Sequence, residues 1–186
     1  MDITLASQNS GKIREFQKLL SPHNLISANI DVEESGLSFH ENALLKARAC
    51  AKNTPGIYIG DDSGIMVDAL MGQPGIYSKR YKGANTNQDA IDHVIQDLNG
   101  QESNAQMVCV LALLRHINDP LPTFFIGVLP GIMKLTPTGS QGFAYDPYFY
   151  LPRLQKTNGQ LTLEEKNAIS HRALAAKKLL AYLNTK

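Results

Sequence analysis

Two adjacent carboxylates, Asp61 and Asp62, are the residues of this sequence with the clearest capacity for chemistry. They follow the apolar run 57–59 and lead into Ser63 and Gly64, which predicts acids at the end of a strand that opens into a glycine turn. Because neighbouring side chains in a strand point to opposite faces, we expect the two aspartates to have different roles. The competing interpretation is a solvated acidic turn, since Asp, Ser and Gly all favour turns.

Cationic side chains follow this acidic pair closely. Gly72, Pro74 and Gly75 lead to Lys79 and Arg80, which stand between two tyrosines. Carboxylates suit a hard cation, and lysine and arginine suit phosphate oxygens. The combination indicates phosphoryl-transfer chemistry.

The N-terminus predicts an anion-binding element. An alternating stretch at residues 3–6 predicts a strand, and a helical apolar period follows after a polar loop. That loop, residues 7–11, would turn its backbone amides and Lys12 toward a phosphate. It departs from a P-loop at two positions, because the first glycine and the hydroxyl residue of that motif are missing. A plain helix capped by Asn9 or Ser10 is the alternative.

Further acids and a lysine lie in the next elements. After another predicted strand, Glu33 and Glu34 occupy an acidic loop, which is equally compatible with solvated surface. Residues 38–53 carry an apolar stripe at helical spacing, which predicts a helix. That helix could direct Lys46, and Glu41 from its first turn, toward the same ligand as the acidic pair. A surface lysine on an amphipathic helix is the commoner case.

The second half of the chain alternates apolar runs with loops. Residues 107–114 predict a strand covered on both faces, and residues 123–129 predict its neighbour. Prolines and glycines from Pro130 onward then predict an irregular segment. The aromatic stretch 143–152 surrounds Asp146 and could stack on a base, although aromatic clusters more often form core.

Two amphipathic helices complete the predicted elements. Residues 90–98 have helical apolar spacing, and a single C-terminal helix is predicted to begin after the capping box of Thr162. His171 and Arg172 lie early in that helix, with Lys166 before them. Neighbouring His and Arg form either an exposed helical face or a pair of donors aimed at a ligand.

The bulk composition excludes several classes of protein. With 186 residues, 43% of them hydrophobic, the chain suits one domain spanning residues 1–186. A net charge of +1 argues against general nucleic-acid binding. The two cysteines, Cys50 and Cys109, indicate neither a disulfide framework nor a zinc site. Neither a signal peptide nor a long apolar run is evident, so we expect a cytoplasmic protein without membrane association.

Five stretches together resemble the inosine/xanthosine triphosphate pyrophosphatase family, the Ham1-like nucleotide hydrolases. They occur in the family's order between residues 5 and 172 and cover most of the chain. No single stretch is specific, whereas five in order are. The stretches are LASQNSGK, SFHENALLKA, GDDSGIMVDALMGQPGIYSKRY, GFAYDPYF and LEEKNAISHR.

The resemblance implies an α/β fold with a long mixed central β-sheet, flanking helices and two lobes around a nucleotide cleft, generally as a homodimer. It implies Mg²⁺-dependent hydrolysis of ITP, dITP and XTP to the monophosphate and pyrophosphate. By motif, Asp62 would be the catalytic base, and Glu34 and Asp62 would bind the metal. By motif, the triphosphate would be bound by Ser7, Gln8, Asn9, Ser10, Gly11 and Lys12, with Lys46 and Lys79 as further phosphate cations and Ser63 as a further substrate-binding residue beside Asp62. The residues that the motifs imply would hold and read the purine base are Phe143, Ala144, Tyr145, Asp146, Lys166, His171 and Arg172.

The sequence departs from the family pattern at a few positions and leaves alternatives open. Gly60 and Ala144 replace the usual residues, with a modest effect expected on metal geometry or base fit, and His40 is also atypical. Glu33 or Glu41 could replace Glu34 as the second metal ligand. The division of roles between the two aspartates is undecided. The rival functions are a Maf-type or broader nucleotide pyrophosphatase and a catalytically silent nucleotide-binding module.

Overall fold

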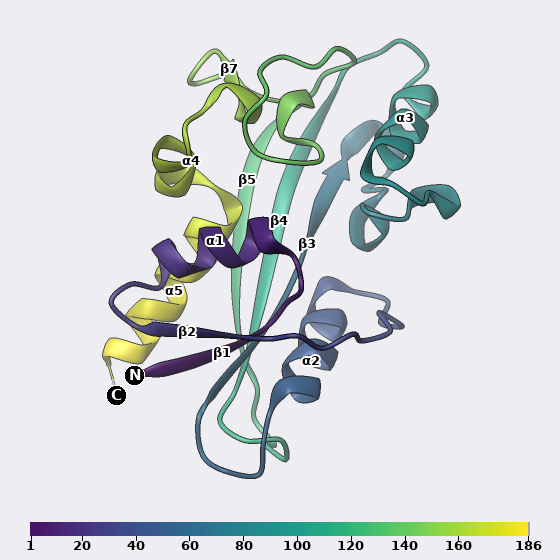
Figure 1. Ribbon diagram of the computed structural model, residues 1–186. Coiled ribbons are helices and arrows are strands. Elements are labelled where there is room, and N and C mark those ends of the chain that lie inside the picture. Colours follow the sequence, from purple (N-terminus) through teal and green to yellow (C-terminus); the bar gives the residue numbers. More distant parts are fainter. Residues whose placement is uncertain (186) are drawn as a thin grey trace. The chain divides into compact units, whose positions relative to one another are not determined.

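A computed structural model describes residues 1–185 as a mixed seven-stranded sheet flanked by helices (Figure 1). The strand order is β2-β1-β3-β4-β5-β6-β7. The strands are β1 (Asp2–Ala6), β2 (Asn24–Ala28), β3 (Ile57–Val67), β4 (Ser103–Leu114), β5 (Thr123–Met133), β6 (Phe149–Leu151) and β7 (Lys156–Thr157). The α-helices are α1 (Ser10–Leu19), α2 (Phe39–Cys50), α3 (Asn87–Asp97), α4 (Leu163–Ile169) and α5 (His171–Asn184). Short 3₁₀ helices include η2 (Gly75–Tyr77) and η4 (Asp146–Tyr148).

Strand direction explains where the acidic pair lies. β1 pairs in parallel with β2 on one side and with β3 on the other, whereas β5, β6 and β7 pair antiparallel. The β1–β3 register ends at Ala6 opposite Gly60, one residue before Asp61. In parallel sheets, ligand sites form where the carboxyl ends of neighbouring strands meet. The loop after β1 and the two aspartates therefore lie at the same edge of the sheet, where the pairing of β1 with β3 ends. The predicted mixed sheet is confirmed.

Several strands and helices predicted from the sequence are confirmed, and burial and helix capping explain them. Every residue of the run 107–114 on β4 is buried, as expected for a strand covered on both faces, and β5 is its neighbour. Thr86 begins α3 with a capping box to Asp89, and Ser38 caps α2 by accepting from the Glu41 amide. These caps satisfy backbone amides that have no partner within the helix.

Three boundaries were predicted wrongly. β3 does not end at the acids but continues through Ser63 and Gly64 to Val67, because lysines neutralise both carboxylates and no exposed turn is needed. β5 continues through Pro130 to Met133; this proline is exposed, where a strand tolerates the missing amide. The predicted single C-terminal helix is two helices, because Ser170 adopts an extended conformation with ψ 157°.

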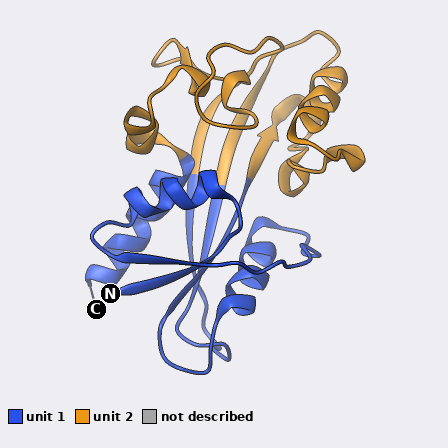
Figure 2. Ribbon diagram, in the orientation of Figure 1, with its two compact units in different colours: residues 1–63, 109–127, 171–186 blue, residues 64–108, 128–170 orange. Residues whose placement is uncertain are grey.

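The chain divides into two compact units (Figure 2). Unit 1 comprises residues 1–63, 109–127 and the chain from residue 171 onward; unit 2 comprises residues 64–108 and 128–170. Unit 1 has a core that includes Phe16, Ile59 and Leu111, and in this unit α1 packs beside α5. Unit 2 has its own core around α3 and the aromatic segment. Among the described residues, every helix is too short or too polar to cross a membrane.

Gly60 allows α2 to lie directly on β3. A Cβ atom at this position would stand 2.1 Å from the Ala43 carbonyl oxygen and 2.9 Å from the Lys46 Cβ. We expect Gly60→Ala to lower the free energy of unfolding by about 1–3 kcal/mol, because the helix backbone must move. The same movement would displace Lys46 and lower kcat/KM, a larger effect than the modest one expected from sequence. Thermal melts and nucleotide kinetics measure both effects, and an unchanged melting temperature would contradict the prediction.

Candidate active site

The loop after β1 is closed by its own side chains. Asn9 is the N-cap of α1, and its side-chain oxygen accepts hydrogen bonds from the Gly11 and Lys12 amides at 2.9 and 3.1 Å. The Ser7 hydroxyl accepts from the Asn9 amide at 3.2 Å. Gln8 and Ser10 are exposed. Of the two caps considered from sequence, Asn9 is therefore the cap. The Lys12 side chain extends from the first turn of α1.

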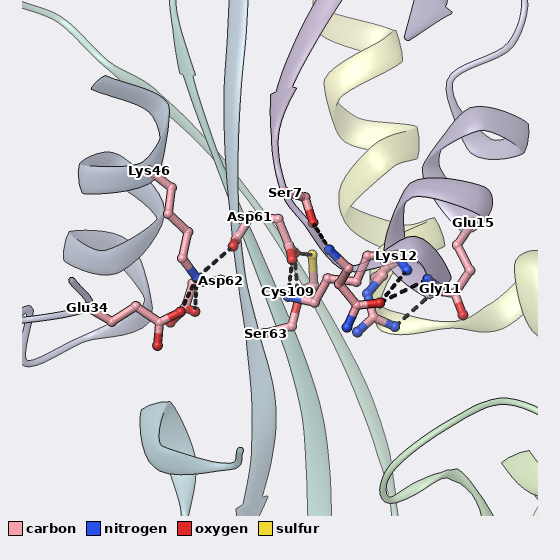
Figure 3. Close-up of polar contacts among 12 residues, drawn as sticks. Ser7, Gly11, Lys12, Glu15, Glu34, Lys46, Asp61, Asp62, Ser63 and Cys109 are labelled. Carbon is pink, nitrogen blue, oxygen red and sulfur yellow. Dashed lines mark hydrogen bonds and ion pairs between the residues drawn. The ribbon is translucent and has the colours of Figure 1, made fainter. Parts of the chain in front are cut away.

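The two aspartates point to opposite sides of β3, as predicted (Figure 3). Asp61 forms an ion pair with Lys12 of α1. Asp62 forms an ion pair of 2.8 Å with Lys46 of α2. Each acid thus has its own lysine, supplied by a different helix, and α1 and α2 lie on opposite faces of the strand.

Asp61 is enclosed and fully ionised. It is 2% exposed and accepts hydrogen bonds from the Ser63 hydroxyl at 2.6 Å and the Cys109 thiol at 3.2 Å. Burial favours a higher pKa for Asp61, but the charges of Lys12 and Arg172 outweigh burial and hold the pKa well below its usual range. Asp61 is therefore a fixed anion that orients Lys12.

Asp62 has a different environment. One carboxylate oxygen contacts Lys46, whereas Oδ2 is buried and has no hydrogen-bond partner among the described residues. Burial raises the pKa of Asp62 above its ordinary value, and Lys46 offsets part of that effect. A carboxylate with a raised pKa accepts a proton more readily, and an oxygen without a partner is available to a ligand. Asp62 is therefore the better placed of the two acids to act on water.

Glu34 lies next to Asp62 through a shared lysine. Its Oε1 is 2.5 Å from the Lys46 ammonium that also contacts Asp62. Glu41 instead accepts from the Leu37 amide at 2.6 Å and from the Ser38 hydroxyl, so it stabilises the start of α2. Glu33 is exposed. Of the three glutamates considered from sequence, the structure brings Glu34 to Asp62.

The described residues contain no cluster of three or more His, Cys, Asp or Glu side chains arranged for a metal ion. The pair of Glu34 and Asp62 nevertheless has the chemistry that Mg²⁺ requires. The two carboxylates converge on the Lys46 ammonium, and Asp62 Oδ2 is a buried oxygen without a hydrogen-bond partner among the described residues. Mg²⁺ commonly uses one or two carboxylates and takes its other ligands from phosphates and water. The donor set is therefore compatible with Mg²⁺ bound together with a phosphate.

Two residues of this group were missed from sequence. Cys109 reaches Asp61 from the neighbouring strand β4, and burial together with the Asp61 charge raises the pKa of its thiol, which keeps it a hydrogen-bond donor. Glu15 is buried on α1 and forms an ion pair of 2.9 Å with Arg172. Its i, i+3 spacing from Lys12 was a signal that could have placed it on the same helical face.

The predicted base-reading residues of unit 2 form a compact cluster. Asp146 Oδ2 accepts from the Phe143 amide at 2.8 Å and from the Lys166 ammonium at 2.7 Å. Lys166 also lies 5.1 Å from the centre of the Phe143 ring. Asp146 and Lys166 are both buried, so their charges are paired in a dry environment. Tyr145, the residue directly before Asp146, is also buried, whereas Lys79 of the same unit is exposed.

His171 and Arg172 begin α5, directly after the extended Ser170. Both are buried in unit 1. Gly127 of β5 permits this placement, because a Cβ there would stand 1.9 Å from the His171 carbonyl oxygen. The interpretation of the two side chains as an exposed helical face is therefore wrong.

Ala144 has the backbone conformation that usually requires glycine, with φ 50°. We expect Ala144→Gly to raise the free energy of unfolding by about 0.5–1 kcal/mol, because the left-handed region costs a residue with a Cβ about 1–2 kcal/mol. Ala84, with φ −55°, is the matched control. Ala84→Gly should destabilise the protein by a similar amount. Chemical denaturation measures both, and a loss of stability in Ala144→Gly would contradict the prediction.

The chain is similar to known proteins over nearly its whole length. Residues 3–182 match the Ham1 family. The chain is 45% identical to a dITP/XTP pyrophosphatase of Yersinia pseudotuberculosis and 46% identical to that of Escherichia coli K12, each over 96% of this chain and 95% of the relative. A solved HAM1 protein from Coxiella burnetii is 41% identical and superposes with a TM-score of 0.90, with all of both chains covered.

Proposed function

Because the chain belongs to the Ham1 family, we propose that it hydrolyses deaminated purine nucleoside triphosphates such as ITP, dITP and XTP to the monophosphate and pyrophosphate. The observation that carries the proposal is the acidic pair of β3, in which each aspartate faces its own lysine. A Maf-type pyrophosphatase and a silent nucleotide-binding module are not favoured, since the relatives are named dITP/XTP pyrophosphatases.

The lysines provide the charge for the triphosphate. Lys12 and Lys46 each neutralise a carboxylate and keep 16% and 14% of their side chains exposed. Burial favours a lower pKa for Lys46, but Asp62 and Glu34 outweigh burial and raise it, so the ammonium stays charged. Ammonium groups at this position would bind phosphate oxygens and stabilise the charge that develops on the leaving pyrophosphate.

Asp62 is the proposed general base. It would orient a water molecule and take one proton from it as the oxygen of that water bonds to phosphorus. The P–O bond of the α–β anhydride breaks at the same time, and pyrophosphate leaves with the electron pair of that bond. Asp61 stays ionised and holds Lys12. The two neighbouring acids would therefore have different roles, Asp62 as the base and Asp61 as the anion that orients Lys12.

Mg²⁺ would be held by Glu34 and Asp62, and when bound it supplies positive charge to the phosphate oxygens. Removal of divalent cations with a chelator should therefore abolish turnover while the fold is retained. Activity that survives the chelator would reject this part of the proposal.

The base end of the substrate is assigned to the cluster of Phe143, Asp146 and Lys166 in unit 2. Aromatic stacking binds any purine, whereas cationic donors pair with a 6-oxo group and are left unpaired by the 6-amino group of adenine. Leaving buried donors unpaired is costly, which supports discrimination against ATP.

The test is pyrophosphate release with Mg²⁺ across ITP, dITP, XTP, ATP, GTP and dTTP. We expect turnover of the first three to exceed that of the others by at least about a hundredfold in kcat/KM. Equal activity on all six would retain the hydrolase and reject the base assignment. Activity on none would reject the proposed function.

We further propose a cytoplasmic homodimer that binds neither nucleic acid nor membranes. The two cysteines are free and buried, which suits a reducing compartment, and the net charge is close to zero. Light scattering after size exclusion measures the oligomeric state, and a monomer at micromolar concentration would reject the dimer.

A further inference from the structure

The Tyr145 side chain joins two segments of unit 2 that are far apart in sequence. Its hydroxyl donates a hydrogen bond of 2.9 Å to the backbone carbonyl of Ser78, 67 positions away. Tyr145 is 6% exposed and Ser78 is 9% exposed. A hydrogen bond in such a dry environment is strong, and loss of its donor would leave a buried carbonyl unsatisfied.

Ser78 is held firmly from its other side. Its hydroxyl accepts from the Ile65 amide of β3 at 2.9 Å and donates to the Gly75 carbonyl of η2 at 2.6 Å. The peptide that receives the Tyr145 hydrogen bond is therefore attached to the central sheet. Lys79 follows directly and is exposed, so its flexible side chain starts from a fixed point of the backbone.

The loop on the Tyr145 side is equally constrained. Tyr145 lies between Ala144, which has a left-handed backbone, and Asp146, the first residue of η4. Asp146 in turn binds the Phe143 amide and the Lys166 ammonium. A shift of Tyr145 would therefore move this loop as a unit relative to Lys79, with the contacts among Phe143, Asp146 and Lys166 retained.

We propose that Tyr145 is a positioning residue that sets the distance between the base-reading loop, residues 142–147, and Lys79. Its hydroxyl does not contact the purine. The proposal rests on the proposed function and on the family motifs, which imply a phosphate-binding role for Lys79 and a base-binding role for Phe143 and Asp146. A substrate that engages both segments at once benefits only when their spacing matches its own. A fragment that engages one segment is insensitive to that spacing.

The test uses Tyr145→Phe, which removes the hydroxyl and keeps the ring in the core. We expect KM for ITP to rise about tenfold, because the two segments are no longer held at the spacing that the substrate requires. The affinities for the two products, IMP and pyrophosphate, measured separately by calorimetry, should each change less than about twofold. Tyr148→Phe is the matched control, since Tyr148 is a buried tyrosine of the same segment. That variant should leave KM for ITP unchanged.

A double-variant cycle with Lys79→Ala tests whether Tyr145 acts through the Lys79 segment. In the Lys79→Ala background, Tyr145→Phe should change KM for ITP less than about twofold. The contact between Lys79 and the phosphates of ITP, which Tyr145 is proposed to align, is already absent in that background. Additive effects, or an unchanged KM in Tyr145→Phe alone, would overturn the proposal. Loss of IMP affinity as large as the loss for ITP would also overturn it, because the hydroxyl would then contact the purine.

Hydrogen exchange separates failure of this inference from failure of the proposed function. In Tyr145→Phe, amide protection should fall in both segments, residues 75–80 and 142–147. If protection falls but the wild-type protein turns over no nucleotide, the connection between the segments stands and the proposed function is rejected. Unchanged protection rejects the connection, whatever the activity.

Discussion

In Asp62→Asn we expect kcat for ITP to fall about a thousandfold, because the amide cannot accept the proton of the attacking water. Asparagine has nearly the same shape, and Asp62 Oδ2 has no hydrogen-bond partner in residues 1–185, so the melting temperature should stay within a few degrees of that of the wild type. Single-turnover kinetics and thermal melts measure the two effects. Wild-type kcat in this variant would remove Asp62 from the mechanism.

Asp61→Asn is the matched control, since it makes the same chemical change at the neighbouring position. Asp61 holds Lys12, so we expect this variant to raise KM for ITP more than it lowers kcat. It should also lower stability at neutral pH. Because the pKa of Asp61 is lowered in the folded protein, its contribution is present above the usual aspartate range and is lost as pH falls through the folded pKa. The difference in melting temperature from the wild type should therefore narrow in acid. A loss of kcat equal to that of Asp62→Asn, with KM unchanged, would mean that Asp61 also acts in the chemical step.

The second large effect is expected from the buried pair of Asp146 and Lys166. In Lys166→Met the free energy of unfolding should fall by about 3–5 kcal/mol, because the Asp146 carboxylate is left in a dry site without its cation. Asp146 is 3% exposed and Lys166 is 2% exposed, so solvent cannot compensate. Denaturant titration measures the loss.

The double variant Asp146→Asn/Lys166→Met is the control for this prediction. It removes both charges, so it should recover most of the lost stability. Selectivity should not recover, because the cluster beside Phe143 no longer carries its donor and acceptor. Recovery of the ITP preference in the double variant would remove the pair from base reading, and a double variant as unstable as Lys166→Met would contradict the electrostatic explanation.

Local sequence patterns predicted much of this fold. The apolar run on β4 and the helical stripe of α2 reflect burial, and burial is encoded directly in residue type and spacing. The expectation that the two aspartates face opposite sides depends only on the geometry of a strand. The prediction was therefore correct even though the end of that strand was misplaced.

The errors arise where distant residues decide the outcome. The Asp-Asp-Ser-Gly stretch has the composition of a turn, but Lys12 lies 49 positions from its partner and Lys46 lies 16 positions from its own. Local propensity does not include such partners. The ion pair of Glu15 and Arg172 joins residues 157 positions apart, so no local pattern could specify it. The break at Ser170 has neither proline nor glycine to mark it.

The continuity of β3 through Asp61 and Asp62 also determines how the protein tolerates changes in chain length. A strand alternates its faces residue by residue, so deletion or insertion of one residue between Gly56 and Gly60 would turn each acid to the opposite side. Asp61 would then face the helix that carries Lys46, and Asp62 the helix that carries Lys12. The composition of the site would be unchanged, yet the carboxylate available to water would stand on the wrong side of the sheet. A substitution in this segment, even at Gly60, leaves both acids on their own sides of the strand, whereas a change of a single residue in its length exchanges the two sides.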